Sequence, residues 1–173
     1  NVTGTGSVNI GNVTPNTIGA TTGINSIVGT ATTSGGLVVG INSSATGTVL
    51  IQNNTFGAMT SSGITATIAG SVCGINVSGV TASMTITGNT IGNGTTDNMR
   101  GGTTALTTGS SLVTGIAIVS IPTLCNVTNN TIQNLTSYGT GATGRAAGIF
   151  NSGTPAAATV LNITGNTIFN ILS

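Results

Sequence analysis

The chain has 173 residues, with two Lys or Arg, one Asp or Glu and no His, which gives a net charge of +1. Acid–base catalysis uses His or carboxylates, glycoside hydrolysis uses two carboxyl groups, calcium sites use several oxygen ligands with more than one carboxylate, and nucleic-acid binding uses a basic patch. The sequence therefore predicts a protein that is not an enzyme, holds no cofactor or metal, and has no nucleic-acid partner.

The composition indicates an all-β fold in a single domain that spans residues 1–173. The chain has 28 Gly, no Glu and no Lys, and Thr, Ile and Val recur throughout, which disfavours helices and favours strands. No apolar run approaches the ~20 residues that a membrane-spanning helix needs, so we expect no membrane insertion. The chain begins at Asn1 without a Met, and we expect it to be a processed or excised segment.

A short motif, Asn-Thr followed by a bulky apolar residue, divides the chain into repeats. Successive motif asparagines are 38, 35, 41 and 36 residues apart, and they are Asn16, Asn54, Asn89, Asn130 and Asn166. A near-constant spacing of roughly 37 residues is the signature of a stacked repeat. In chain order, residues 1–15 read as an incomplete first coil, and full coils follow at 16–54, 54–89, 89–130 and 130–166. About four to five coils are therefore expected.

Each coil is predicted to contain three short strands. Because side chains alternate along a strand, the residues five and three positions before each corner Asn should point inward. These are Gly11 and Val13, Val49 and Ile51, Met84 and Ile86, Cys125 and Val127, and Leu161 and Ile163. A Gly-Ile strand predicts a second inward column, formed by Ile41, Ile75, Ile116 and Ile149. Two residues before each of these isoleucines, a further set is expected to point the same way: Val39, Cys73, Thr114 and Ala147.

Three strands per repeat with corners between them predict a parallel β-solenoid. The third strand begins with the Thr-Ile that follows each corner, and Ile64 to Ile68 would add a further strand within the coil 54–89. Asn tolerates the left-handed backbone of a sharp corner, and amides stacked ~4.8 Å apart can form a hydrogen-bonded ladder. Ordinary turn asparagines without a ladder are the alternative. Neither end shows a polar capping repeat, so uncapped ends are expected.

The few remaining reactive groups suggest little chemistry. Asp97 and Arg100 fall in the extra length of the longest coil, where we expect a weak exposed pair that Arg145 could join. Cys73 and Cys125 occupy predicted inward positions on different strands more than one repeat apart. That separation favours buried free thiols over a disulfide, although an extracellular protein would permit one.

One outward column is rich in threonine, namely Thr14, Thr87, Thr128 and Thr164. A regular Thr face can order water, which makes an ice-binding protein an alternative function. Gln52 interrupts the column, and the coils differ in length. A flat match to an ice lattice is therefore poor.

The pattern GI … VxIxxNTI resembles the right-handed parallel β-helix repeats of the pectate-lyase-like superfold. The segments CNVTNNTIQNLTSYGTGATGRAAGIFNSG and LNITGNTIFNIL are similar to β-helix repeats of very large secreted surface proteins and adhesins of Bacteroidetes-type bacteria. The resemblance implies an extracellular or cell-surface protein, typically exported by the type IX route. Enzymes of the superfold carry clustered Asp, Lys and Arg on the coil surface, which this chain lacks, so the resemblance assigns no catalytic residue.

The favoured function is a structural or adhesive surface module, a stiff rod that is either part of a longer array or a filament subunit. Its partners would be copies of itself or flanking repeats of the same protein. The alternatives are the ice-binding solenoid and a carbohydrate-binding β-helix that contacts surface glycans. Sugar sites usually use aromatic platforms, and the only candidates are Phe56, Tyr138, Phe150 and Phe169.

Overall fold

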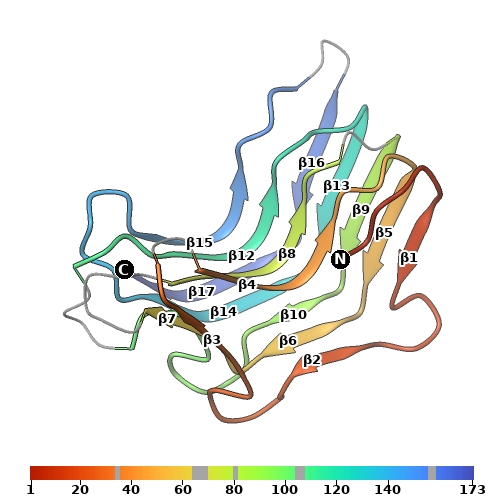
Figure 1. Cartoon of the computed structure of the whole chain (residues 1–173). Helices are drawn as coiled ribbons and strands as arrows, with labels where there is room; N and C mark the ends of the chain where they lie inside the picture. Colours follow the sequence, from red (N-terminus) through yellow and green to blue (C-terminus); the bar gives the residue numbers. More distant parts are fainter. Residues whose placement is uncertain (34–35, 64–69, 80–81, 104–107, 156–158) are drawn as a thin grey trace.

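A computed structural model describes residues 1–33, 36–63, 70–79, 82–103, 108–155 and 159–173, which contain strands and no helix (Figure 1). All strand pairs are parallel and join successive coils, so the chain forms a β-solenoid of about four turns, as predicted. The further strand predicted from Ile64 to Ile68 lies outside the described residues.

The strands form three sheets. In the first and third, the colours of Figure 1 advance along the stack from the N-terminal coil toward the C-terminal coil, and in the second, two series of strands advance toward one shared C-terminal strand. The first sheet contains, in spatial order, β1 (Val8–Ile10), β5 (Thr48–Gln52), β9 (Ser83–Thr87), β13 (Leu124–Thr128) and β16 (Val160–Thr164). The second sheet contains β2 (Thr17–Gly19), β6 (Thr55–Gly57), β10 (Thr90–Ile91), β14 (Thr131–Ser137), β11 (Met99–Gly101), β7 (Met59–Gly63) and β3 (Ile27–Ala31), with β17 (Thr167–Leu172) paired to β14. The third sheet contains β4 (Gly36–Ser43), β8 (Gly70–Val77), β12 (Leu112–Ile118) and β15 (Arg145–Asn151).

The core consists of columns of apolar side chains that follow the stack. In the first sheet, Ile51 pairs with Ile86 and Ile86 pairs with Val127, and all three side chains are fully buried. The other two sheets add equivalent columns, which include Phe56, Ile91 and Ile132, then Met59, Met99 and Leu135, and then Ile75 and Ile116. Each fully buried aliphatic side chain contributes roughly 1.5–3 kcal/mol. The small, branched residues of the sequence therefore suffice for a thin stacked core.

The strands of the third sheet bend partway along their length, as the outlines of β8 and β12 show in Figure 1, and the strand register is interrupted at a glycine in each strand. Gly74 separates Cys73 from Ile75, and a Cβ on Gly74 would lie 2.7 Å from the carbonyl oxygen of Gly115 and 2.9 Å from Ile91 Cγ2. Only a residue without a side chain fits at this bend. Gly40, Gly115 and Gly148 occupy the same place in their coils and are similarly crowded.

The bend corrects one prediction about side-chain direction. Ile75 is buried in the core, but Cys73 and Asn76 line a groove on the outer face of the third sheet. Thr114 lines the same groove. The expectation that Cys73 and Thr114 point inward with the isoleucines is therefore wrong, because the glycine between them interrupts the alternation on which it depended.

The first coil differs from the predicted register. Strand β1 ends at Ile10, which pairs with Ile51, so Ile10 takes the inward place that the spacing assigned to Val13. The Val13 side chain is 92% exposed. The residues between Gly11 and Asn16 form a loop instead of a strand, and Pro15 within it has no N–H to donate to a neighbouring coil. The inward positions predicted for Gly11 and Val13 were therefore wrong.

Candidate functional site

The five corner asparagines lie above one another and form an amide ladder. The side-chain nitrogen of each donates to the side-chain oxygen of the next, at 2.8 Å from Asn16 to Asn54, 3.1 Å from Asn54 to Asn89, 3.0 Å from Asn89 to Asn130 and 2.9 Å from Asn130 to Asn166. The three middle asparagines are buried. Every rung has the same direction, since the donor always belongs to the coil nearer the N-terminus.

Each rung also fixes the backbone of its own and the adjacent coil. The Asn89 oxygen accepts the Asn54 N–H at 3.0 Å, and the Asn89 nitrogen donates to the carbonyl oxygens of Ile51 at 3.0 Å and Thr87 at 3.1 Å. Buried amides are stable only when their donors and acceptors are paired. The ladder therefore satisfies polar groups that are buried at the three middle corners.

The left-handed backbone of the corner belongs to the residue before the ladder asparagine. Positive φ angles occur at Asn53 (58°), Gly88 (64°), Asn129 (56°) and Gly165 (65°), and not at the ladder asparagines that follow them. The prediction that the corner asparagines themselves adopt this conformation is therefore wrong. The hydrogen bonds of their side-chain amides, rather than their backbone conformation, explain why Asn recurs at the ladder position in every coil.

The apolar columns reach the C-terminal coil without a cover. Ile163 pairs with Val127, but its side chain is 44% exposed whereas Val127 is fully buried. Leu161 and Ile168 are exposed in the same coil, although their partners Cys125 and Ile132 are buried. The column of Ile41, Ile75, Ile116 and Ile149 stays in register and ends with a half-buried Ile149.

The threonine column on the outer face of the first sheet is short. Thr87 pairs with Thr128 and Thr128 with Thr164, and the Thr128 hydroxyl lies 3.0 Å from that of Thr87. Thr14 lies beyond the end of β1 and outside this column. The same outer face carries exposed Leu124 and Val160 beside its polar side chains.

Two outer amide series were not foreseen. Asn76 donates to Asn42, and Asn42 to Asn1, each at 2.7 Å along the third sheet. On the first sheet, Asn162 donates to Asn126 at 2.8 Å. The repeated Gly-Ile-Asn triplet, at 40–42 and 74–76, was the sequence signal for the first of these.

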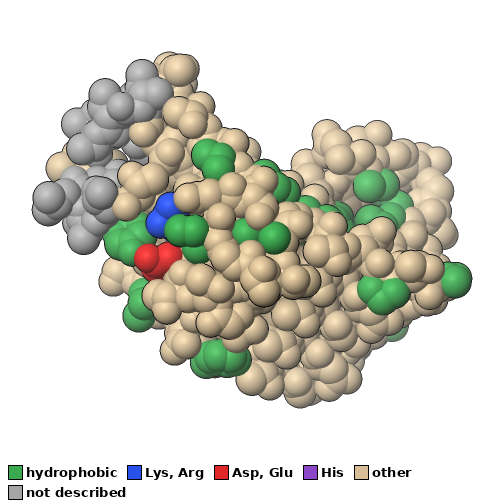
Figure 2. All heavy atoms as spheres, turned by 90° about the horizontal axis from the view of Figure 1, so that it is seen from below, with side chains coloured by type: hydrophobic (Ala, Val, Ile, Leu, Met, Phe, Trp, Pro, Cys, Tyr) green, Lys and Arg blue, Asp and Glu red, His purple; other side chains and the backbone are tan. Residues whose placement is uncertain are grey.

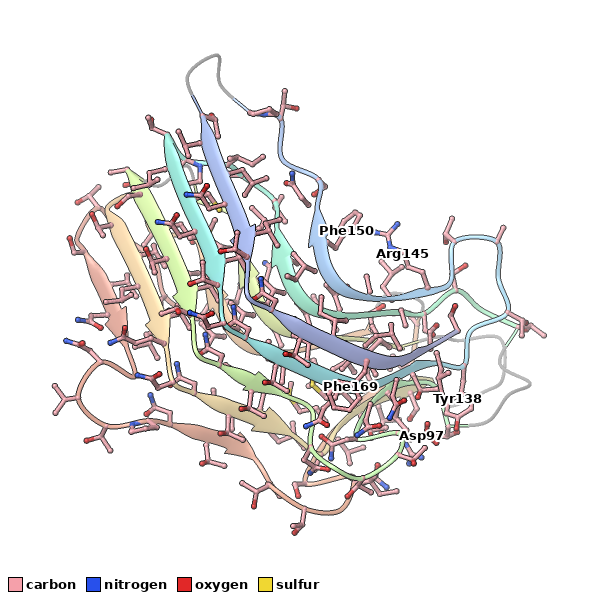
Figure 3. The ribbon with its side chains drawn as sticks, turned by 180° about the vertical axis from the view of Figure 1, so that it is seen from behind. Asp97, Tyr138, Arg145, Phe150 and Phe169 are labelled. Atoms are coloured by element: carbon pink, nitrogen blue, oxygen red, sulfur yellow. The ribbon has the colours of Figure 1, made fainter. Side chains whose placement is uncertain are left out.

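The charged side chains have neutral partners. The Tyr138 hydroxyl donates to Asp97 Oδ2, and Figure 3 shows the two side chains close together beside the second sheet. Arg100 donates to Asn25 at 3.0 Å and to Thr60 at 3.3 Å. The Arg145 guanidinium lies over the Phe150 ring, 3.9 Å from its centroid. The expected grouping of Asp97 with the two arginines is therefore replaced by three separate contacts.

The groove on the outer face of the third sheet has a volume of about 370 Å³. Leu37, Cys73, Leu112, Thr114, Arg145 and Phe150 are among its lining residues. Both cysteines are free and buried, with Cys125 in the core and Cys73 beside this groove. Burial raises the thiol pKa of Cys73 to about 12 and that of Cys125 to about 11, so both are protonated near neutral pH.

Within the described ranges, no three His, Cys, Asp or Glu side chains come together in a group that could hold a metal ion. The described part of the chain contains no helix long and apolar enough to cross a membrane. Comparison of the chain with protein-family models, curated proteins and solved structures finds no match.

Proposed function

We propose that this chain is a non-catalytic structural module, a stiff β-solenoid rod of an extracellular or cell-surface protein that is extended by coil stacking. The resemblance of its repeats to those of secreted bacterial adhesins supports this role, as does a composition almost free of titratable side chains. Its partners would be further coils, supplied either by flanking repeats or by copies of the same chain.

The observation that carries the proposal is the uncovered C-terminal coil. Leu161, Ile163 and Ile168 continue buried columns but are themselves exposed. Exposed apolar side chains next to unpaired strand edges favour association with another strand. The inward side chains of β16 and β17 are all uncharged, so a following coil would bury no charge against them.

The corner ladder gives this stacking a direction. The side-chain nitrogens of the first four ladder asparagines each donate to the next corner toward the C-terminal coil. The Asn166 nitrogen donates to the Val127 carbonyl oxygen, and a following corner would give it the same side-chain acceptor. At the opposite end, no described residue donates to the side-chain oxygen of Asn16. A head-to-tail joint would match these groups, and a head-to-tail contact that does not close generates filaments.

Sedimentation velocity of the full chain tests the proposal. We expect species larger than the 16.6 kDa monomer, whose size increases with protein concentration, because association buries the exposed apolar side chains of the end coil. Ile163→Lys places a charge in the uncovered column and should leave a monomer. Asn162→Lys adds the same charge on the outer face of the same strand and should behave as the wild type. A wild-type chain that remains monomeric at all concentrations would contradict self-stacking.

A further inference from the structure

We propose that the outer face of the second sheet, beside Asp97 and Tyr138, holds a binding site for a neutral saccharide. This inference goes beyond the structural role and does not depend on stacking. It rests on a hollow, on a carboxylate held by a phenol, and on a buried hydroxyl without a partner.

Asp97 carries the only carboxylate side chain of the sequence. Asp97 lies between β10 and β11 with a left-handed φ of 57°, and the Tyr138 hydroxyl donates to its Oδ2. From the described residues, no donor other than Tyr138 reaches Asp97. Arg100, three residues away, is hydrogen-bonded to Asn25 and Thr60. The carboxylate therefore keeps acceptor capacity for a ligand.

Two adjoining hollows of about 460 Å³ and 210 Å³ lie beside this pair. They share Thr96, Asp97, Thr136 and Leu172, and the larger one also includes Tyr138. The larger volume falls within the ~300–1,000 Å³ that is usual for small-molecule sites. Seen from below, one acidic spot lies beside a basic one at the edge of an otherwise uncharged surface (Figure 2).

Thr136 provides independent support for a ligand, because its buried hydroxyl lacks a hydrogen-bond partner. Its side chain is only 5% exposed, lines both hollows, and has a hydroxyl oxygen with no hydrogen-bond partner. A buried hydroxyl without a partner costs about 1–3 kcal/mol. Its neighbour in register on β11, Arg100, is directed to other partners. A rotation of the Thr136 side chain about χ1 would turn this shielded oxygen toward the smaller hollow, where a ligand hydroxyl would supply the missing bond.

A saccharide fits these groups better than an ion does. Sugar hydroxyls can donate to Asp97 and exchange hydrogen bonds with Thr96 and Thr136, while the apolar face of a pyranose ring can pack on Tyr138 and Leu172. Calcium takes six to eight oxygens, usually with more than one carboxylate, and only Asp97 is available. An anion would need a free cation, and Arg100 is already hydrogen-bonded.

Tyrosine fluorescence tests the site directly, because Tyr138 is the only Tyr and the chain has no Trp. Glucose, galactose, mannose and N-acetylglucosamine are titrated separately into the full chain and into the monomeric Ile163→Lys variant. We expect at least one sugar to give a saturable change in both proteins. Asp97→Asn and Thr136→Val should each weaken that sugar about tenfold or more, and the matched control Thr164→Val, on the outer face of β16, should not.

Three results would overturn the inference. The first is a lack of saturation with all four sugars. The second is a sugar response that neither Asp97→Asn nor Thr136→Val alters, which would place binding elsewhere. The third is a saturable response to calcium chloride alone that Asp97→Asn abolishes, which would make this a cation site. Thermal unfolding of each variant establishes that it is folded, and none of these results depends on whether the wild type stacks.

Discussion

At the scale of single residues, the molecule pairs each of its few charges with a neutral group. Asp97 accepts from Tyr138, Arg100 donates to Asn25 and Thr60, and Arg145 lies over Phe150. The sequence identified the charged residues but predicted that they would pair with one another. Their actual partners lie in other coils or at the far end of the same strand. The prediction relied on the short sequence separation between Asp97 and Arg100, which gives no information about such partners.

The contact between Tyr138 and Asp97 predicts an alkaline titration. The hydrogen bond to Asp97, then burial and the carboxylate charge, raise the pKa of Tyr138, and Arg100 opposes this in part. A raised pKa in the folded state means that this contact stabilises the fold below the ordinary tyrosine pKa of about 10, and that the stabilisation is lost as pH rises through the folded value. Because there is no other tyrosine, phenolate absorbance reports Tyr138 alone.

We expect the absorbance midpoint of the folded chain to lie above pH 10, and Asp97→Asn to move it down toward the ordinary value. Arg100→Gln removes the opposing charge and should move it up. A midpoint that Asp97→Asn leaves unchanged would show that the carboxylate does not control this hydroxyl.

At the scale of elements, the corners were the most predictable part of the fold. An amide that recurs at a fixed place in every coil has a stacked neighbour, and the spacing of Asn54, Asn89 and Asn130 was enough to predict a ladder. The backbone conformation of the corner was harder to predict from the sequence. Two residue types, Asn and Gly, alternate before the ladder position, and their shared left-handed backbone is visible only in the φ angles.

The third sheet shows why strand direction was harder to predict. An alternation rule holds while the strand is straight, and the rule placed Ile75 and Ile116 correctly in the core. A glycine precedes each of these isoleucines where the strand bends, and Cys73 and Thr114, on the other side of that glycine, line the outer groove instead. The prediction for the first coil was wrong for a related reason. Ile10 lies six residues before Asn16, whereas its partner Ile51 lies three residues before Asn54, so a fixed offset from the corner asparagine misses three additional residues.

The ladder predicts an unequal effect of two asparagine substitutions. Asn89→Ala leaves the Asn54 N–H and side-chain nitrogen, and the Ile51 carbonyl, without these buried partners, so we expect the free energy of unfolding to fall by about 3 kcal/mol. Asn162→Ala removes one exposed bond to Asn126 and should cost less than about 1 kcal/mol. Urea unfolding followed by circular dichroism measures both. Equal losses would mean that the buried ladder carries no special stability.

At the scale of the whole molecule, the strand pairs join only successive coils, and the few bonds that reach two coils away run from residues 93–100 to residues 20–25, in the N-terminal half of the stack. Stability in such a stack is approximately a sum of coil and interface terms, so opening can begin at an end. The C-terminal coil has the weakest cover, because its inward side chains Leu161, Ile163 and Ile168 are exposed. Opening should therefore begin at β16 and β17 and reach the interior one coil at a time.

The two buried thiols make this order measurable. Cys125 lies on β13, which β16 covers directly, whereas Cys73 lies on β8, between β4 and β12. Thiolates are the reactive species, and with pKa values of about 11 and about 12 both thiols should resist N-ethylmaleimide at pH 8 in the folded chain.

In urea below the unfolding midpoint, peptide mass spectrometry should find Cys125 labelled before Cys73. The Ile163→Lys variant should widen that difference, because it weakens the strand that covers Cys125, while Asn162→Lys should not. Labelling of both thiols at one rate would show that the solenoid opens as a single unit, and that its uncovered end is no weaker than its middle.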